Sequence, residues 1–153
     1  MGKMKRFLVF VYVALVSLFC TSCVMDVQYV SVPFTVNDAY YSLLNNDKTV
    51  KGVYYSQSEF DRDFKPAIAG SESMGKLVDF SSSFVVTITD VAANTYRKIE
   101  ITEILEKDMI LHVKYRIVTQ KESSSKMHPC IVASINRDYV NYDIAFHDVT
   151  DWE

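Results

Sequence analysis

Residues 109–119 read "MILHVKYRIVT", and the alternation of apolar and polar side chains in this stretch decides the expected fold. The apolar set is Leu111, Val113, Tyr115 and Ile117, and the polar set between them is His112, Lys114 and Arg116. Because successive side chains of a strand point to opposite faces, this pattern predicts a strand with one buried and one solvated face. Such a strand is typical of an antiparallel sheet, since parallel sheets are covered on both faces.

The same period of two continues on both sides of this stretch. We expect strands at "FVVTITD" (84–90), "YRKIEITEI" (96–104), "CIVASI" (130–135) and "YDIAF" (142–146). The connections "VAAN" (91–94) and "EKD" (106–108) are short enough to join the first strands as hairpins. The second half of the chain therefore predicts a four- to five-stranded, mainly antiparallel sheet.

The first half of the chain predicts one or two short helices. In "NDAYYSLLNND" (37–47), Tyr40 and Leu44 recur at helical spacing after a possible asparagine or aspartate cap. In "SQSEFDRDF" (56–64), Ser56 and Glu59 form a capping-box pattern. Helices followed by a run of strands indicate the α+β class.

Two further strands are expected before that sheet. "TVKGVYY" (49–55) is a strand candidate rich in β-branched and aromatic residues. "QYVSVPF" (28–34) is expected at a sheet edge, because Pro33 cannot donate a hydrogen bond to a ladder.

The N-terminus has the layout of a secretory signal. Basic residues in 1–6 precede the uncharged run 7–19, which is shorter than the roughly 20 residues a membrane-spanning helix needs. The segment resembles a bacterial lipoprotein signal, with Cys23 as the acylated residue after small Thr21 and Ser22. Ordinary cleavage after Ser22 is the alternative.

The lipoprotein interpretation divides the chain into a signal peptide (1–22), a tether (23–33) and a single domain (34–153). It predicts a membrane partner through a lipid anchor on Cys23. By resemblance to Gram-negative lipoproteins, Val24 in place of an aspartate favours the outer membrane of the bacterial envelope.

Charge and composition exclude several function classes. Residues 1–22 carry three of the sixteen basic residues and none of the nineteen acids, so their removal takes the net charge from −3 to −6. Nucleic-acid binders are usually basic, and we expect no nucleic-acid partner. The chain has four glycines and no glycine-rich phosphate loop, and we expect no cofactor.

Three stretches together resemble the C-terminal domain of the bacterial protease complex-associated polypeptide family. They are "VDFSSSFVVTITD" (78–90), "IEITEILEKDMILHVKY" (99–115) and "HPCIVASI" (128–135). Asn94-Thr95-Tyr96 stands where that family commonly has a Gly-Gly-Tyr turn. The resemblance implies a non-enzymatic binding domain associated with extracellular proteolysis, as a protease-complex partner or an inhibitor-like module.

Two polar segments are the candidate partner-binding loops, since binding residues concentrate on loops held by a rigid scaffold. The first is the hairpin turn 92–96, where Tyr96 is a candidate aromatic anchor. The second is the loop 121–129. The candidate residues of the two loops are Asn94, Thr95, Tyr96, Ser123, Ser124 and Lys126.

Two alternatives to a protein-binding module stay open. A small exported hydrolase or metal-dependent enzyme would need His112, His128 or His147 to converge with an acid or with Cys130. A structural or adhesion component of the envelope would need no such cluster. No spacing of these residues predicts a shared site, so we expect no catalytic residue and no metal.

Overall fold

Two four-stranded sheets stack face to face in the computed structural model, which describes residues 28–69, 72–73 and 77–150. Sheet A has the order β1 (Val30–Ser31), β9 (Ala93–Lys107), β10 (Ile110–Met127) and β12 (Asp143–Asp148). Sheet B has the order β2 (Phe34–Val36), β11 (Cys130–Asn136), β8 (Ser83–Thr89) and β4 (Val50–Tyr54). All ladders within these sheets are antiparallel except that of β10 with β12.

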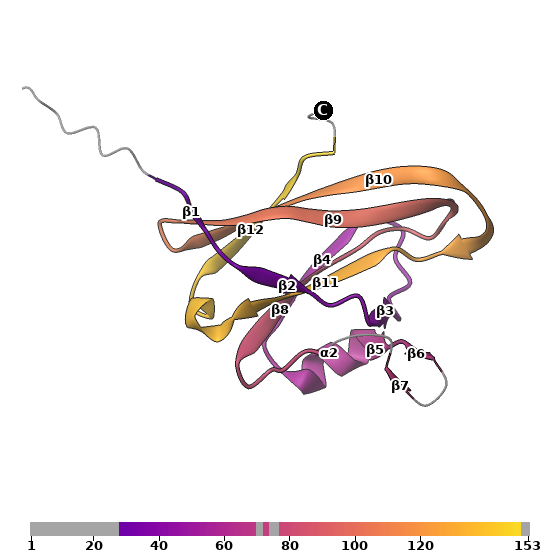
Figure 1. Cartoon of the computed structure of the whole chain (residues 1–153). Coiled ribbons are helices and arrows are strands. Elements are labelled where there is room, and N and C mark those ends of the chain that lie inside the picture. Colours follow the sequence, from indigo (N-terminus) through magenta and orange to yellow (C-terminus); the bar gives the residue numbers. More distant parts are fainter. Residues whose placement is uncertain (1–27, 70–71, 74–76, 151–153) are drawn as a thin grey trace, which may run out of the picture.

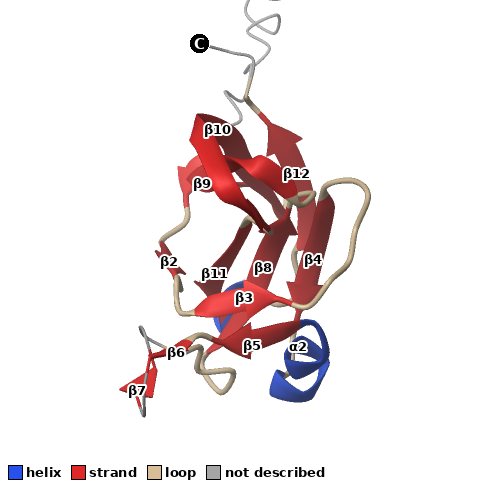
Figure 2. Ribbon diagram, turned by 90° about the vertical axis from the view of Figure 1, so that its right-hand side faces the viewer, coloured by secondary structure: helices blue, strands red, loops and turns tan. Residues whose placement is uncertain are grey.

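A third layer covers the other face of sheet B. It consists of helix α2 (Gln57–Asp63) and the paired strands β3 (Tyr40–Ser42) and β5 (Phe64–Pro66). The small pair β6 (Ile68–Ala69) and β7 (Glu72–Ser73) and the 3-10 turn η1 (Arg137–Tyr139) complete the described elements. Figure 1 shows the three layers in order, from the long β9–β10 ribbon to α2, and Figure 2 shows them from the side.

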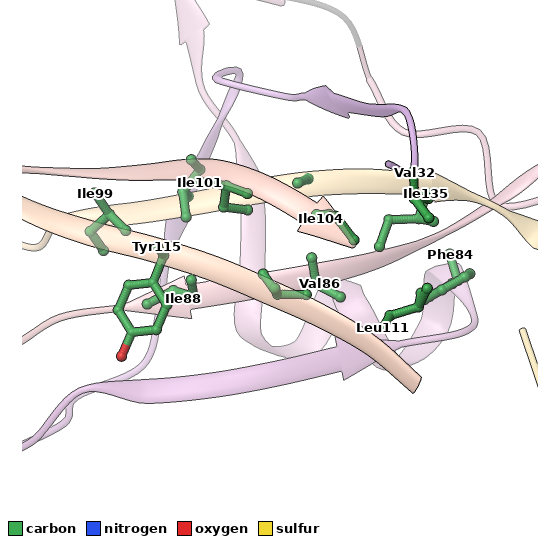
Figure 3. Close-up of a cluster of buried hydrophobic side chains, with 13 residues drawn as sticks. Val32, Phe84, Val86, Ile88, Ile99, Ile101, Ile104, Leu111, Tyr115 and Ile135 are labelled. Carbon is green, nitrogen blue, oxygen red and sulfur yellow. The ribbon is translucent and has the colours of Figure 1, made fainter. Parts of the chain in front are cut away.

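The main core lies between the two sheets. Strand β10 contributes Leu111, Val113 and Tyr115, each no more than 1% exposed, as the alternation of residues 109–119 predicts. Ile117 is partly buried at the end of this row. These side chains face Phe84, Val86 and Ile88 of sheet B (Figure 3).

Strand β8 is buried on both faces. Residues 84–89 are all buried, because even-numbered side chains face sheet A while Val85 packs against the third layer. The sequence expectation of one wet face therefore fits sheet A and fails for sheet B.

The α+β expectation is wrong, because the described residues are mostly strand and contain one α-helix. The helix predicted in 37–47 is absent, and β3 lies there instead. Tyr40 pairs with Pro66 on β5, packs edge-on against Phe60 at a ring-centroid distance of 5.0 Å, and accepts a hydrogen bond from the Val78 N–H. These long-range contacts outweigh a weak helical period, which local propensity alone does not decide.

The "VAAN" hairpin is also a wrong prediction. Strands β8 and β9 lie in different sheets, because β8 already has β11 on one side and β4 on the other. Residues 91–92 therefore cross between the sheets. The single mainly antiparallel sheet becomes two sheets, and the last strand joins β10 in a parallel ladder.

Other predictions are confirmed. Helix α2 begins at the predicted cap, where Ser56 Oγ accepts a hydrogen bond from the Glu59 N–H at 3.4 Å. The "EKD" hairpin joins β9 to β10. The stretch around Pro33 lies at sheet edges, since β1 is the outermost strand of sheet A and β2 is the outermost strand of sheet B.

Candidate functional site: an open strand edge beside a groove

One edge of strand β9 is paired over only part of its length in the described part of the chain. On the side opposite β10, it pairs with β1 at Leu105 and Glu106, and Val32 N–H donates to the Ile104 carbonyl at 2.8 Å. The chain then turns at Pro33 toward sheet B. No described strand pairs with Ile99–Glu103 on this side, so these residues have no ladder partner there.

A β-bulge gives this edge its shape. Lys114 on β10 pairs with Glu103, and the next residue, Tyr115, pairs with Ile101, which leaves Thr102 as the extra residue. Its hydroxyl donates to the Lys114 carbonyl at 3.3 Å. Because the bulge shifts the side-chain phase by one, both Ile101 and Ile104 point into the core, and the strand twists more strongly there.

A groove of about 840 Å³ runs beside the open edge. Strand β9 forms one wall, and the segments around β2, β3 and the start of β11 form the other. Val36 and Tyr41 line the groove and are 46% and 49% exposed, so both side chains are available to contact a ligand. The groove lies between the two sheets, and both apolar and charged side chains line it.

The basic side chains of the groove and Glu100 form ion pairs. Glu100 accepts from Lys98 at 2.9 Å and from Arg116 at 3.1 Å, and these hydrogen bonds hold its pKa below the usual 4.5. Arg97 forms a 2.7 Å ion pair with Asp90, which is buried. These pairs compensate the charges of Arg97, Lys98, Glu100 and Arg116 within the protein.

His128 and Cys130 line the same groove, but the thiol lacks the character of a nucleophile. Burial raises the pKa of Cys130, so the thiol stays protonated at neutral pH. Its Sγ lies 3.7 Å from the Tyr40 carbonyl, to which it donates. The arrangement gives no support to thiol chemistry at the groove.

The two candidate binding loops are strands, which corrects that expectation. Asn94, Thr95 and Tyr96 belong to β9, and the second set, Ser123, Ser124 and Lys126, belongs to β10. The ladder sets Thr95 opposite Glu122 and Tyr96 opposite Lys121, so the structure brings the two segments side by side at the far end of the β9–β10 ribbon. The side chains of Tyr96 and of residues 120–127 lie outside the description.

The three histidines do not share one site. His112 and His147 contact each other on the outer face of sheet A, with Nδ1 and Nε2 2.9 Å apart, while His128 lines the groove. The sequence missed this contact because it depends on the parallel pairing of β12 with β10. Within the described ranges, no cluster of three or more His, Cys, Asp or Glu side chains is placed to hold a metal ion.

Sequence reasoning also missed the groove. Two sequence features correspond to the groove. Pro33 ends the pairing of β1, and the spacing of Ile99, Ile101 and Ile104 breaks the period of two. Val36 and Tyr41 could not be singled out, because their exposure depends on where β2 and β3 lie relative to β9.

Comparison with protein families, curated proteins and solved structures finds no match to this chain. The resemblance to the protease complex-associated polypeptide family therefore stays a prediction. None of the helices in the described residues is long and apolar enough to span a membrane. Cys23 and the signal segment lie outside the described residues.

Proposed function

We propose that this chain is a protein-binding module of the bacterial cell envelope that takes up an extended peptide segment as an added strand on β9. The unpaired edge at Ile99–Glu103 beside the groove with the exposed Val36 and Tyr41 is the observation that carries this proposal. In strand addition, backbone hydrogen bonds supply affinity, while pockets for alternate side chains supply specificity. Both components have a counterpart here.

The segment that fits is about five residues long, to match Ile99–Glu103, and has apolar side chains at alternate positions. Those side chains would contact Val36 and Tyr41, which stand exposed at the groove. A charged segment is not favoured, because the ion pairs of Glu100 and Asp90 already satisfy much of the charge of the walls.

The edge also carries features that limit indiscriminate pairing. A bulge and charged side chains are the usual protections of an exposed edge strand against aggregation. Here the bulge at Thr102 requires the incoming strand to follow a local irregularity. Binding would therefore select segments whose backbone matches this shape, which suits a specific partner.

Two further parts of the proposal rest on the sequence. Acylation of Cys23 would hold the module at the membrane. Val24, in place of an aspartate after the acylated cysteine, favours the outer membrane. The family resemblance adds a protease-complex component as the partner class, either assisted or inhibited by the module.

The hydrolase alternative gains no support from the protonated thiol of Cys130. A structural or adhesion role would leave the β9 edge without a peptide ligand.

A matched pair of tyrosine variants tests the proposal. Peptides are selected from a random library on the purified full chain, and their affinities are measured by calorimetry. Tyr41→Ala should weaken binding by about fivefold or more, since exposed aromatic anchors commonly contribute at least about 1 kcal/mol. Tyr29→Ala is the control, because Tyr29 is equally exposed at 49% and lies on the outer face of sheet A.

An equal loss of peptide affinity in both variants would overturn the placement of the site. So would unchanged affinity in both variants. Failure to select any extended apolar segment would overturn strand addition itself and favour the structural role.

A further inference from the structure

His112 and His147 form a close pair on the outer face of sheet A, far along the chain from each other. His112 Nδ1 lies 2.9 Å from His147 Nε2, and the ring centroids are 5.1 Å apart with an interplanar angle of 27°. The parallel ladder sets His147 opposite Lys114, so the two histidines are diagonal neighbours on adjacent strands.

The strand phases hold both rings on the solvent side. His112 lies between Leu111 and Val113, which are both fully buried, so its own side chain must face outward. His147 follows Phe146, which packs against the core, and is itself exposed. Two backbone ladders therefore fix the pair, and solvent ions can reach it.

We infer that this histidine pair is a chelating site for a divalent transition metal of the Ni²⁺ or Cu²⁺ type. Metal–imidazole bonds are about 2.0–2.1 Å long, and two of them at right angles place their nitrogens about 2.9 Å apart. That separation matches the observed one. Tetrahedral coordination, as in zinc sites, opens the angle and requires a nitrogen separation of about 3.3 Å.

Binding needs no net change of charge on the ligands. In the hydrogen-bonded pair, one of the two facing nitrogens carries the proton, and metal binding moves it to the other nitrogen of the same ring. Burial, followed by the charges of His147 and nearby lysines, lowers the pKa of His112 below 6.5. The neutral ring that a metal requires is thus favoured at neutral pH.

The charged groups near the pair are Lys107, Lys114 and Asp108, and the charge of Lys114 is compensated by an acid. Lys114 pairs with Glu103 at 2.7 Å, and Lys107 lies 4.9 Å from the centre of the Tyr29 ring. Asp108 contributes a negative charge that acts on His112. Water or a group from a partner molecule would complete the coordination shell. The site is separate from the β9 edge, so it goes beyond the proposed function.

Calorimetric titration of the full chain, without an affinity tag, with NiCl₂ at pH 7.5 tests this inference. Nickel is the probe because cysteine thiols such as that of Cys130 reduce Cu²⁺. We expect one site with a dissociation constant in the micromolar range. His112→Ala and His147→Ala should each weaken it by at least about tenfold, and His128→Ala, which removes a histidine of the groove, should leave it unchanged.

A second measurement does not depend on the variants folding. On addition of NiCl₂, paramagnetic broadening should remove the imidazole resonances of His112 and His147 together in the unmodified chain, while those of His128 remain. Absence of nickel binding below millimolar concentration, retention of the site in both pair variants, or broadening confined to His128 would overturn the inference.

Discussion

The turn between β9 and β10 places a methionine in a conformation that favours glycine. Asp108 and Met109 have φ values of 53° and 61°, the pattern of a type I′ turn. Asp tolerates this region, but the Met109 Cβ is strained there, and its side chain is 57% exposed with little packing to lose. Met109→Gly should raise the free energy of unfolding by about 0.5–1 kcal/mol in urea denaturation.

Met109→Ala is the matched control, because it removes the same side chain but keeps the Cβ. It should give no gain. A gain of equal size from both variants would attribute the effect to loss of the exposed side chain and not to the turn.

Stability should fall as the pH drops through about 6.5, in part because of His112. Its pKa is lower in the folded chain than the ordinary 6.5, so the unfolded chain binds more protons below that pH and is favoured. The groups that face the ring are His147, Tyr29, Lys107, Lys114 and Asp108. Hydrogen bonds from Lys98 and Arg116 lower the pKa of Glu100 below 4.5, so any stability that Glu100 contributes is lost only at more acidic pH.

Melting temperatures at pH 7.0 and 5.5 measure this effect. His112→Gln, which cannot titrate, should lose less stability over this interval than the parent chain. An identical loss in both chains would assign the pH dependence to other groups.

At the scale of the element, β10 has one buried and one solvated face, and substitutions should separate the two. Val113 is fully buried between the sheets, so Val113→Ala should cost about 1–4 kcal/mol. Lys114 pairs with Glu103 at side-chain exposures of 36% and 44%, where an ion pair contributes little. Lys114→Ala should cost less than about 0.5 kcal/mol in chemical denaturation, and equal costs would contradict the strand phase.

Elements with a strong local pattern were predictable from sequence, and pairing between distant elements was not. The alternation around Val113 and the N-cap at Ser56 each depend on neighbours in the chain, and both predictions are confirmed. Tyr40 lies in a strand because it pairs with β5. The face of β8 that was predicted to be solvated is buried because the third layer covers it. Nothing local to these residues encodes those contacts.

The candidate site shows the same division. Asn94–Tyr96 and Ser123–Lys126 were expected to be loops because they are polar and lie near short connections, but strands β9 and β10 extend through both. The ladder pairs Thr95 with Glu122, passes a register shift over residues 123–126, and resumes with Met127 opposite Ala93. The open edge arises from a single proline that ends the pairing of β1, together with a sheet change that sequence spacing does not reveal.

At the scale of the whole molecule, acylation of Cys23 should place the domain at a membrane. Growth with a radiolabelled fatty acid should label the parent chain and leave Cys23→Ala unlabelled, because the acyl chains require that thiol. Cys20→Ala, three residues earlier, should remain labelled. Label retained in Cys23→Ala, or lost in Cys20→Ala, would contradict the lipoprotein proposal.

Amide hydrogen exchange along β9 tests strand addition most directly. In the free chain, about every second amide in Ile99–Glu103 should exchange rapidly, because it points away from β10 and no described strand receives it. A bound peptide from the library selection should protect those same amides and leave the amides of the β12 edge unchanged. Peptide binding without new protection in Ile99–Glu103 would contradict strand addition at β9.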